Sequence, residues 1–448
     1  MSGIAGTALT GKEAFVQKML DKISHRGRAG REVAETENAT LGLVCTEIQK
    51  RSLDRLTKEH IAEDEAESGH MAWAQVQNQR IVLMRDQLGV APVYYGYDQH
   101  GNLCFASEVK ALLEDCSGIK ALPAGHRLIE ARPEPYFRLE KKPPLAESPE
   151  KAAGELRKRL NASVEKRVMR GGEVGSWLSG GLDSSTMAAL ARPYIQKFHT
   201  FAAGLKGAPD LEHAQEVADF IKSEHHQVVV SFADLLEVLP DVIYHLESFD
   251  ALLVRSSITN YLVAKEAAQY VNAVFSGEGG DELFAGYVYL KDLEKEKLAD
   301  ELIDIANRLQ NTALQRVDRS ASAHGTVAHV GFLDPEVVDY ALRIPVEFKL
   351  REDVEKWILR RAMDGKLPPR ILTRRKAKFW EGAGVMELIS DYAEKNITDH
   401  DFSRERNLPN GWVINTKEEL LYYRIFKEHF GELEDLSWMG RTKGAPKQ

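Results

Sequence analysis

The sequence feature that most constrains the fold is the segment Ser179-Gly180-Gly181-Leu182-Asp183-Ser184-Ser185. It follows an apolar run at 174–178, typical of a buried strand, and precedes residues 186–191, which contain no helix breaker. The two glycines allow positive φ angles and leave room for a ligand beside the backbone. Serine hydroxyls and free N–H groups at the positive end of a helix suit an anion, and phosphate fits best.

This segment is not the common phosphate loop, because the chain lacks the Gly-x-x-x-x-Gly-Lys-Ser/Thr spacing. It resembles the SGGxDSS pyrophosphate loop (PP-loop) of the ATP pyrophosphatase family, whose members cut ATP between the α and β phosphates to make an adenylate. The resemblance implies pyrophosphate contacts from Ser179, Gly180, Gly181, Asp183, Ser184 and Ser185. The alternative is a glycine turn flanked by serines, which the strand–turn–helix context disfavours.

Apolar runs alternate with helical stretches in the same part of the chain. Strands are predicted at 174–178, 198–203, 226–230 and 273–275, and helices at 210–222, 232–246 and 256–270. This alternation predicts a doubly wound parallel α/β sheet, whose ligands bind beyond the carboxyl ends of the strands. C-terminal helices predicted at 293–309, 337–342, 357–363 and 417–429 would pack around the sheet.

A second glycine-rich motif runs from Ser276 to Tyr287 with the sequence SGEGGDELFAGY. Carboxylates beside phosphates repel them unless a hard cation lies between, so the motif predicts Mg²⁺. A solvated acidic turn is the alternative. The motif resembles the SGEGSDExFxGY signature of asparagine synthetases, and it stands at the matching position after the pyrophosphate loop.

The asparagine synthetase resemblance implies a role for each matching residue. Leu178, Ala203, Ser276 and Gly277 would hold adenosine, and Asp183 and Asp281 would hold Mg²⁺ and pyrophosphate. Glu278 would support adenylate formation and accept a proton from ammonia. Lys376 would steady the departing pyrophosphate, with membership of a basic surface cluster as its alternative.

The expected acid pocket departs from the family pattern. Residues 249–255 read FDALLVR where the family often reads Tyr-Asp-x-Thr-Thr-Ile-Arg, so leucines replace the threonines. Arg255 is retained as a candidate clamp for the substrate carboxylate. Val327 and His329 replace a glutamate and an arginine, and His329 is interpreted as a helix-end residue rather than a pH-sensitive ligand contact. The pocket is therefore expected to be less polar than aspartate recognition would want.

The first 145 residues predict a β-rich domain, with strands at 42–48, 71–76, 80–84, 93–97 and 103–106. Segments at 1–6, 24–27, 85–96 and 105–112 resemble the glutaminase domain of glutamine-dependent asparagine synthetases, which implies a shortened Ntn-hydrolase-like αββα fold. The family's cysteine nucleophile is replaced by Ser2, whose hydroxyl is harder to ionise than a thiol. The family's glutamine-pocket motifs have no counterpart, and a charged helix is predicted at 51–68 instead. This domain is expected to be catalytically silent.

Prolines and charges at 132–149 predict a linker, so the expected domains are residues 1–145 and 146–448, the second starting with an amphipathic helix at 148–169. A net charge of −9 argues against nucleic-acid binding. Three unpatterned cysteines and the lack of a signal or membrane segment favour a reducing, cytoplasmic setting without membrane insertion.

Together these features predict an ATP- and Mg²⁺-dependent asparagine synthetase-like ligase that adenylates aspartate or an analogue, as β-aspartyl-AMP for aspartate, and releases an amide, AMP and pyrophosphate. The nitrogen source would be free ammonia, another amine, or ammonia from a separate amidase. The alternatives are amidation or cyclisation of a different acid and a non-catalytic ATP-binding subunit. Homodimer formation is left open.

Overall fold

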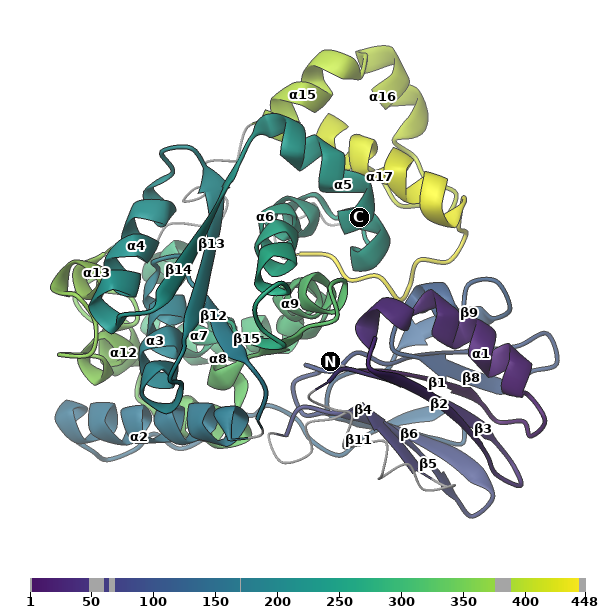
Figure 1. The fold of residues 1–448 in the computed structure, drawn as a ribbon, viewed down its shortest axis with the longest axis horizontal. Coiled ribbons are helices and arrows are strands. Elements are labelled where there is room, and N and C mark those ends of the chain that lie inside the picture. Colours follow the sequence, from purple (N-terminus) through teal and green to yellow (C-terminus); the bar gives the residue numbers. More distant parts are fainter. Residues whose placement is uncertain (1, 48–59, 64–68, 170, 375–387, 443–448) are drawn as a thin grey trace.

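Two antiparallel sheets form the N-terminal part of the molecule (Figure 1). The structure is a computed structural model that describes residues 2–47, 60–63, 69–169, 171–374 and 388–442. In order across the first sheet the strands are β2 (Gly30–Glu35), β3 (Thr40–Cys45), β1 (Gly3–Thr7), β8 (Leu103–Ala106), β7 (Tyr94–Tyr97) and β9 (Ser117–Ala121). The second sheet contains β11 (Arg132–Pro135), β10 (His126–Ile129), β6 (Arg80–Arg85), β5 (Ala72–Gln77) and β4 (His60–Glu63).

Buried side chains of both sheets belong to one core, which includes Leu41, Ala74, Leu83 and Phe105. Helix α1 (Glu13–Lys22) packs on β1 and β3, and it is the only α-helix that the described residues form before residue 149. One described α-helix beside two sheets fits the shortened β-rich domain expected from the sequence. Cys45 and Cys104 are buried and Cys116 is partly buried, all as free thiols.

The predicted helix at 51–68 is wrong at residues 60–63, which form β4 and pair with β5 in antiparallel register. Pairing with the neighbouring strand overrides the local helical preference there. The remaining residues of that prediction lie outside the described part. The proline-rich stretch contributes the exposed edge strand β11, a place where proline is tolerated.

A parallel five-stranded sheet forms the centre of the remaining chain. Its order is β14 (Glu224–Val230), β13 (His199–Leu205), β12 (Val174–Trp177), β15 (Ala273–Phe275) and β16 (Val327–His329). The chain builds outward from β12 through β13 to β14 and then returns to the other side of β12. The strand order therefore reverses between β12 and β15, the point at which open α/β sheets bind ligands.

Helices cover both faces of this sheet, with α3 and α4 on one side and α6 and α9 on the other (Figure 1). Helix α2 begins after Ser148, whose hydroxyl accepts a hydrogen bond from the Lys151 N–H. The helices from α2 to α9 are α2 (Pro149–Val168), α3 (Leu182–Ala191), α4 (Pro209–Ile221), α5 (Phe232–Leu246), α6 (Ala251–Ala267), α7 (Gly280–Phe284), α8 (Lys295–Arg308) and α9 (Ala313–Ser322).

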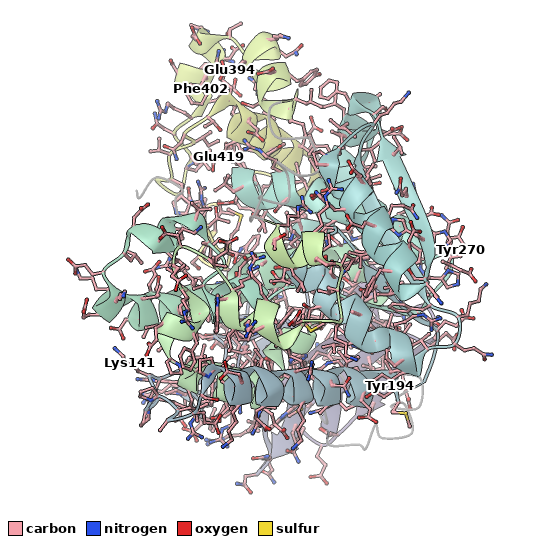
Figure 2. All side chains as sticks on the ribbon, turned by 90° about the vertical axis from the view of Figure 1, so that its left-hand side faces the viewer. Lys141, Tyr194, Tyr270, Glu394, Phe402 and Glu419 are labelled. Atoms are coloured by element: carbon pink, nitrogen blue, oxygen red, sulfur yellow. The ribbon has the colours of Figure 1, made fainter. Side chains whose placement is uncertain are left out.

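The later helices are α10 (Pro335–Arg343), α11 (Val346–Lys349), α12 (Trp357–Ala362), α13 (Pro369–Thr373), α15 (Leu388–Asn396), α16 (Asp399–Glu405) and α17 (Lys417–Phe430). Figure 2 shows three of them at the top of the molecule, marked by Glu394, Phe402 and Glu419. Tyr270 lies at the outer edge in the same view, and its ring centroid is 4.1 Å from that of His226 on the edge strand β14. The predicted mixture of a doubly wound parallel sheet with C-terminal helices is confirmed.

Buried charges join the N-terminal β-rich half of the molecule to its α/β half. The Arg26 guanidinium donates two hydrogen bonds of 2.9 Å to Asp318 of α9 and one of 2.8 Å to Glu108. Arg319, also on α9, contacts Glu108 and Glu247 at 3.1 Å. Burial alone would raise the pKa of Glu108, but His25, Lys110 and Arg319 hold that pKa well below its usual range.

Candidate functional site

The first glycine loop connects β12 to α3 at the predicted position. Gly180 has a φ of +70°, and a Cβ atom there would lie 2.5 Å from the Ala214 backbone nitrogen, so only glycine fits. The hydroxyl oxygens of Ser179 and Ser184 are 3.0 Å apart, and Ser184 also donates to the Gly181 carbonyl oxygen at 3.2 Å. Serine hydroxyls thus surround the N-terminus of α3, where an anion is favoured.

The second glycine loop connects β15 to α7 and touches the first. A Cβ atom on Gly277 would lie 2.7 Å from the Ser184 backbone nitrogen. A Cβ atom on Gly280 would lie 2.5 Å from the carboxyl carbon of Asp183. Because β12 and β15 are adjacent and parallel, both loops leave the sheet at the same edge. Gly277 and Gly280 are therefore required for the contact between the loops.

Asp183 of the first loop and Asp281 of the second meet at the side chain of Lys356. The Lys356 ammonium nitrogen is 2.6 Å from an Asp281 carboxylate oxygen and is also hydrogen-bonded to Asp183. Lys356 is 3% exposed and has a φ of +54° immediately before α12. The structure therefore brings the two predicted metal ligands together around one cation.

Two further carboxylates of the second loop have separate partners. Glu278 forms an ion pair with Arg316 of α9. Glu282 is 3% exposed and accepts a hydrogen bond from the Tyr287 hydroxyl. Burial, together with the charges of Asp281 and Glu278, raises the pKa of Glu282 to about 7.

Arg374 closes the side of the first loop that faces α4. Its guanidinium donates to the Gly180 carbonyl oxygen at 3.0 Å and to Asp210 at 2.5 Å. Lys376, predicted to steady pyrophosphate, lies outside the described residues, and its role stays a prediction.

The two loops open into a cavity of about 660 Å³. Ten predicted site residues line it: Leu178, Ser179, Gly181, Asp183, Ser184, Ala203, Ser276, Gly277, Glu278 and Asp281. Gly180 and Ser185 are in the first loop but are not lining residues, and Ser185 is fully buried. Arg255 is also outside the lining, because its guanidinium pairs with Glu418 of α17, with an Nε to carboxylate oxygen distance of 3.0 Å. Its assignment as an acid clamp stays a prediction.

Several cavity residues that the structure brings to the loops had no predicted role, namely Arg316, Lys356, Arg360 and Arg374. Arg374 lies two residues before Lys376, which the family resemblance singled out, and that was the nearest available signal. Lys356 carries no local motif. His329, interpreted as a helix-end residue, instead ends strand β16 and is 2% exposed, because β16 pairs with β15.

The donor set fits Mg²⁺. Hard cations prefer carboxylate oxygens, and here two carboxylates converge on a position already occupied by a positive charge. Within the described residues no group of three or more His, Cys, Asp or Glu side chains forms a complete metal site. Asp183 and Asp281 therefore fit a cation whose remaining ligands come from phosphate oxygens and water.

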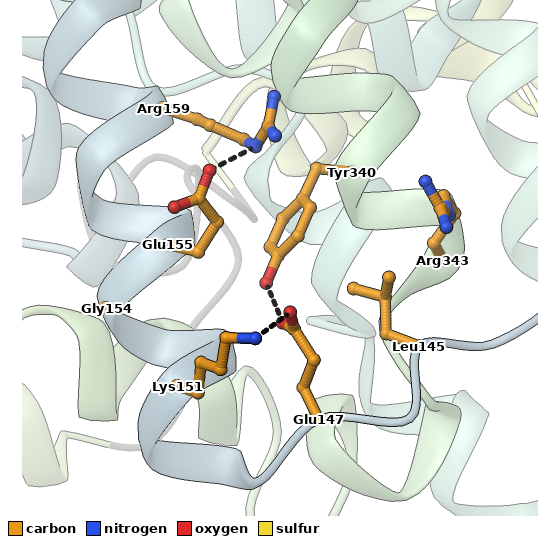
Figure 3. A pocket seen from close by; sticks show the side chains of 8 residues that line it. All are labelled: Leu145, Glu147, Lys151, Gly154, Glu155, Arg159, Tyr340 and Arg343. Atoms are coloured by element: carbon orange, nitrogen blue, oxygen red, sulfur yellow. Dashed lines mark hydrogen bonds and ion pairs between the residues drawn. The ribbon is translucent and has the colours of Figure 1, made fainter.

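A second cavity, of about 690 Å³, lies between α2 and α10 and is shown in Figure 3. Four of its charged side chains are paired: Lys151 with Glu147 at 2.9 Å and Arg159 with Glu155 at 3.1 Å. The Tyr340 hydroxyl also donates to Glu147 at 2.9 Å. None of the predicted site residues lines this cavity.

Ser2, the position of the family nucleophile, is 1% exposed at the start of β1. Its carbonyl oxygen accepts a hydrogen bond of 3.0 Å from Arg26 Nε, the arginine that also binds Asp318. The Ser2 position is thus enclosed by the charged contacts between the two halves.

In the part of the chain that the structure describes, no helix has the length and apolar character needed to cross a bilayer.

Comparison with known proteins gives the family. The asparagine synthase model matches residues 155–311 and 294–445, and the glutamine amidotransferase domain model matches residues 67–129. The glutamine-hydrolysing asparagine synthetase 2 of Lotus japonicus is 35% identical over 374 residues, covering 78% of this chain and 64% of its own length. The enzyme of Sandersonia aurantiaca is 33% identical, covering 82% of this chain and 74% of its own length.

Asparagine synthetase B of Escherichia coli is 34% identical over 78% of this chain and 67% of its own length. This chain therefore spans slightly less than two thirds of the Lotus protein. Among solved structures, the NMN synthetase of Francisella tularensis aligns with 64% of this chain and 97% of its own, at 13% identity and a TM-score of 0.30, too distant a likeness to carry an argument. On the family model and the sequence identities, this chain belongs to the asparagine synthase family.

Proposed function

We propose that this protein is an ATP-dependent carbon–nitrogen ligase that converts a carboxylic acid into an amide through an acyl-adenylate. The observation that carries the proposal is the meeting of Asp183 and Asp281, from two glycine loops, at the Lys356 ammonium. The loops lie at the reversal of strand order, where a parallel α/β sheet binds its ligand. Membership of the asparagine synthase family supports the same chemistry.

In the first step a carboxylate oxygen of the acid attacks the α-phosphorus of ATP. A bond forms between that oxygen and the phosphorus, and pyrophosphate leaves with the electrons of the α–β bridging bond. Lys356 and the N-terminus of α3 offset the charge that grows on pyrophosphate. Mg²⁺ held by Asp183 and Asp281 would supply further charge neutralisation at the phosphates.

In the second step the nitrogen of ammonia attacks the acyl carbon, and AMP leaves with the electrons of the acyl–oxygen bond. Glu278 lines the cavity beside the second loop and is held by Arg316. A carboxylate there can bind ammonium and accept the proton that the nitrogen loses. We assign Glu278 as this base.

The nitrogen source is free ammonia or ammonia from a separate amidase, because the N-terminal site lacks a usable nucleophile. Ser2 carries a hydroxyl instead of a thiol and is 1% exposed, so glutamine has no open route to it. Cytoplasmic location stays a prediction, and homodimer formation stays open.

The test measures AMP and pyrophosphate with Mg²⁺, ATP and a panel of carboxylic acids that includes aspartate, in the presence of either ammonium or glutamine. Product is expected with ammonium and absent with glutamine alone. Equal turnover with glutamine would contradict the silent N-terminal site. Glu278→Ala should lower amide formation by roughly 10²–10⁴-fold while ATP binding persists, and an unchanged yield would assign the base elsewhere.

A further inference from the structure

Beyond the two glycine loops, one face of helix α6 lines the cavity. The lining residues of this helix are Leu252, Leu253, Ser256, Asn260 and Val263, which recur at helical spacing. Leu252 and Asn260 are eight residues apart, or about 12 Å along the helix axis. Asn260 and Val263 lie in the C-terminal half of α6, whereas Leu252 lies in its first turn. The cavity thus extends well past the loops.

Apolar side chains predominate at the end of the cavity near Leu252, alongside the hydroxyls of Thr312 and Thr442. Helix α6 contributes Leu252 and Leu253, α8 contributes Ile305, and the turn and helix that follow contribute Leu309 and Ala313. Leu253 and Leu309 are each 2% exposed and belong to the buried core around the cavity. Leu252 and Leu253 stand where the related sequences often carry threonines. A ligand group at this end would therefore contact mainly hydrocarbon, since the Thr442 hydroxyl is already bonded to Asp250.

The cations that the structure describes in the cavity lining already have acidic partners. Arg360 contacts Glu355 at 2.9 Å, and Arg308, half exposed at the rim, contacts Asp304 at 2.9 Å. The other three are Arg316 with Glu278, Lys356 with Asp183 and Asp281, and Arg374 with Asp210. Among the described lining residues, a second substrate carboxylate would have to displace one of these acids. Leaving that carboxylate unmatched in an apolar chamber would be costly.

We infer that the acid taken by this site is a monocarboxylic acid with an uncharged, apolar tail, and not aspartate. Its carboxylate lies near Glu278 and Arg316, within reach of the α-phosphate, and its tail lies against Leu252, Leu253 and Leu309. The inference rests on the proposed function, since it names the substrate class of the same site. The chemistry is unchanged: the acid oxygen bonds to the α-phosphorus and pyrophosphate leaves.

The experiment is ATP–pyrophosphate exchange with the full chain and Mg²⁺. The apolar probes are 4-methylpentanoate and 3-phenylpropanoate, and the polar probes are aspartate and succinate. The expected result is a kcat/KM at least tenfold higher for the apolar acids, the size of effect that a few methylene contacts produce. Equal or better exchange with aspartate would overturn the inference and leave the proposed function intact.

A pair of leucines on α6 provides the matched variants. Leu252 and Leu262 are both partly buried, but only Leu252 lines the cavity. Leu252→Ser is expected to raise KM for the apolar acids about tenfold, while Leu262→Ser leaves KM unchanged. An unchanged KM in Leu252→Ser would also overturn the inference. Binding of Mg²⁺ and ATP, measured by calorimetry, without exchange for any acid would instead contradict the proposed ligase itself.

Discussion

Two groups of buried charges in this molecule differ in whether a ligand can reach them. Between the halves, Arg26 matches both oxygens of Asp318, and Arg319 matches Glu108 and Glu247, so these charges are enclosed in protein. At the glycine loops, Asp183 and Asp281 share one lysine beside an open cavity. The first arrangement joins the two halves of the molecule, whereas the second leaves charge available to a ligand.

The difference shows that the two parts of the chain expose their charged groups to a ligand to different degrees. The N-terminal segments that resemble a glutaminase now surround a buried serine and a closed ion network. The C-terminal segments keep their carboxylates at a cavity. Buried ion pairs are weak evidence for stability by themselves, but removal of one partner leaves an uncompensated charge. Substitutions should therefore affect folding at the first group and turnover at the second.

The largest effect is expected for Arg26→Met, which leaves Asp318 and Glu108 buried without their shared guanidinium. The free energy of unfolding should fall by about 3–5 kcal/mol in a denaturant titration. The matched control is Arg31→Met, because Arg31 pairs with the largely exposed Asp21 and should cost at most about 1 kcal/mol. Equal losses in the two variants would mean that the enclosed network does not join the halves.

Lys356→Met should act on turnover. Loss of the ammonium removes the charge that offsets pyrophosphate, and AMP formation should fall by roughly 10²–10³-fold. Lys291→Met is the control, since Lys291 pairs with Glu355 at 3.0 Å and does not line the cavity. A Lys356→Met protein with normal pyrophosphate release would remove Lys356 from the mechanism and leave it a structural cation.

Local sequence was sufficient to predict the two glycine loops, because the glycines and hydroxyl groups of each loop lie within a few residues of one another. The strands that precede the loops were predicted for the same reason, since 174–178 and 273–275 are short apolar runs. Lys356 could not be predicted in this way. It reaches Asp183 and Asp281 only after the chain has passed through α8 to α11, so the contact depends on tertiary packing.

Two other differences between the structure and the sequence-based predictions also come from tertiary packing. Strand β16 is three residues long, and its pairing with β15 rather than its own sequence makes it a strand. Arg255 matched a family motif, but its guanidinium reaches Glu418 of a helix far along the chain. A motif predicts which residue type is present, whereas the side-chain partner depends on what packs against it.

A smaller effect concerns pH at the interface between the halves. Burial, with help from Arg28 and Lys265, lowers the pKa of His324 to about 4. The unfolded chain therefore binds a proton between pH 6.5 and 4 that the folded chain excludes. Stability from this group is full above pH 6.5 and is lost as pH falls toward 4.

The free energy of unfolding should drop by about 2 kcal/mol between pH 7 and pH 5 through His324. His324→Gln should flatten that slope in denaturant titrations at several pH values. His400→Gln is the control, because His400 is 82% exposed in α16. An identical slope for the wild type and His324→Gln would show that another group governs the acid response.

The smallest effect is expected from restoring the family nucleophile by Ser2→Cys. A thiol ionises far more readily than a hydroxyl, so identity alone would predict a gain in glutamine hydrolysis. Position 2 is, however, 1% exposed, and its carbonyl oxygen is bonded to Arg26, so we expect glutamine to have little access to it. Glutamate release from glutamine should stay at background, and ammonium-dependent turnover should not change. Measurable hydrolysis would mean that one atom separates this domain from an active glutaminase, and the contrast between its closed charges and the open cavity would then not predict a silent domain.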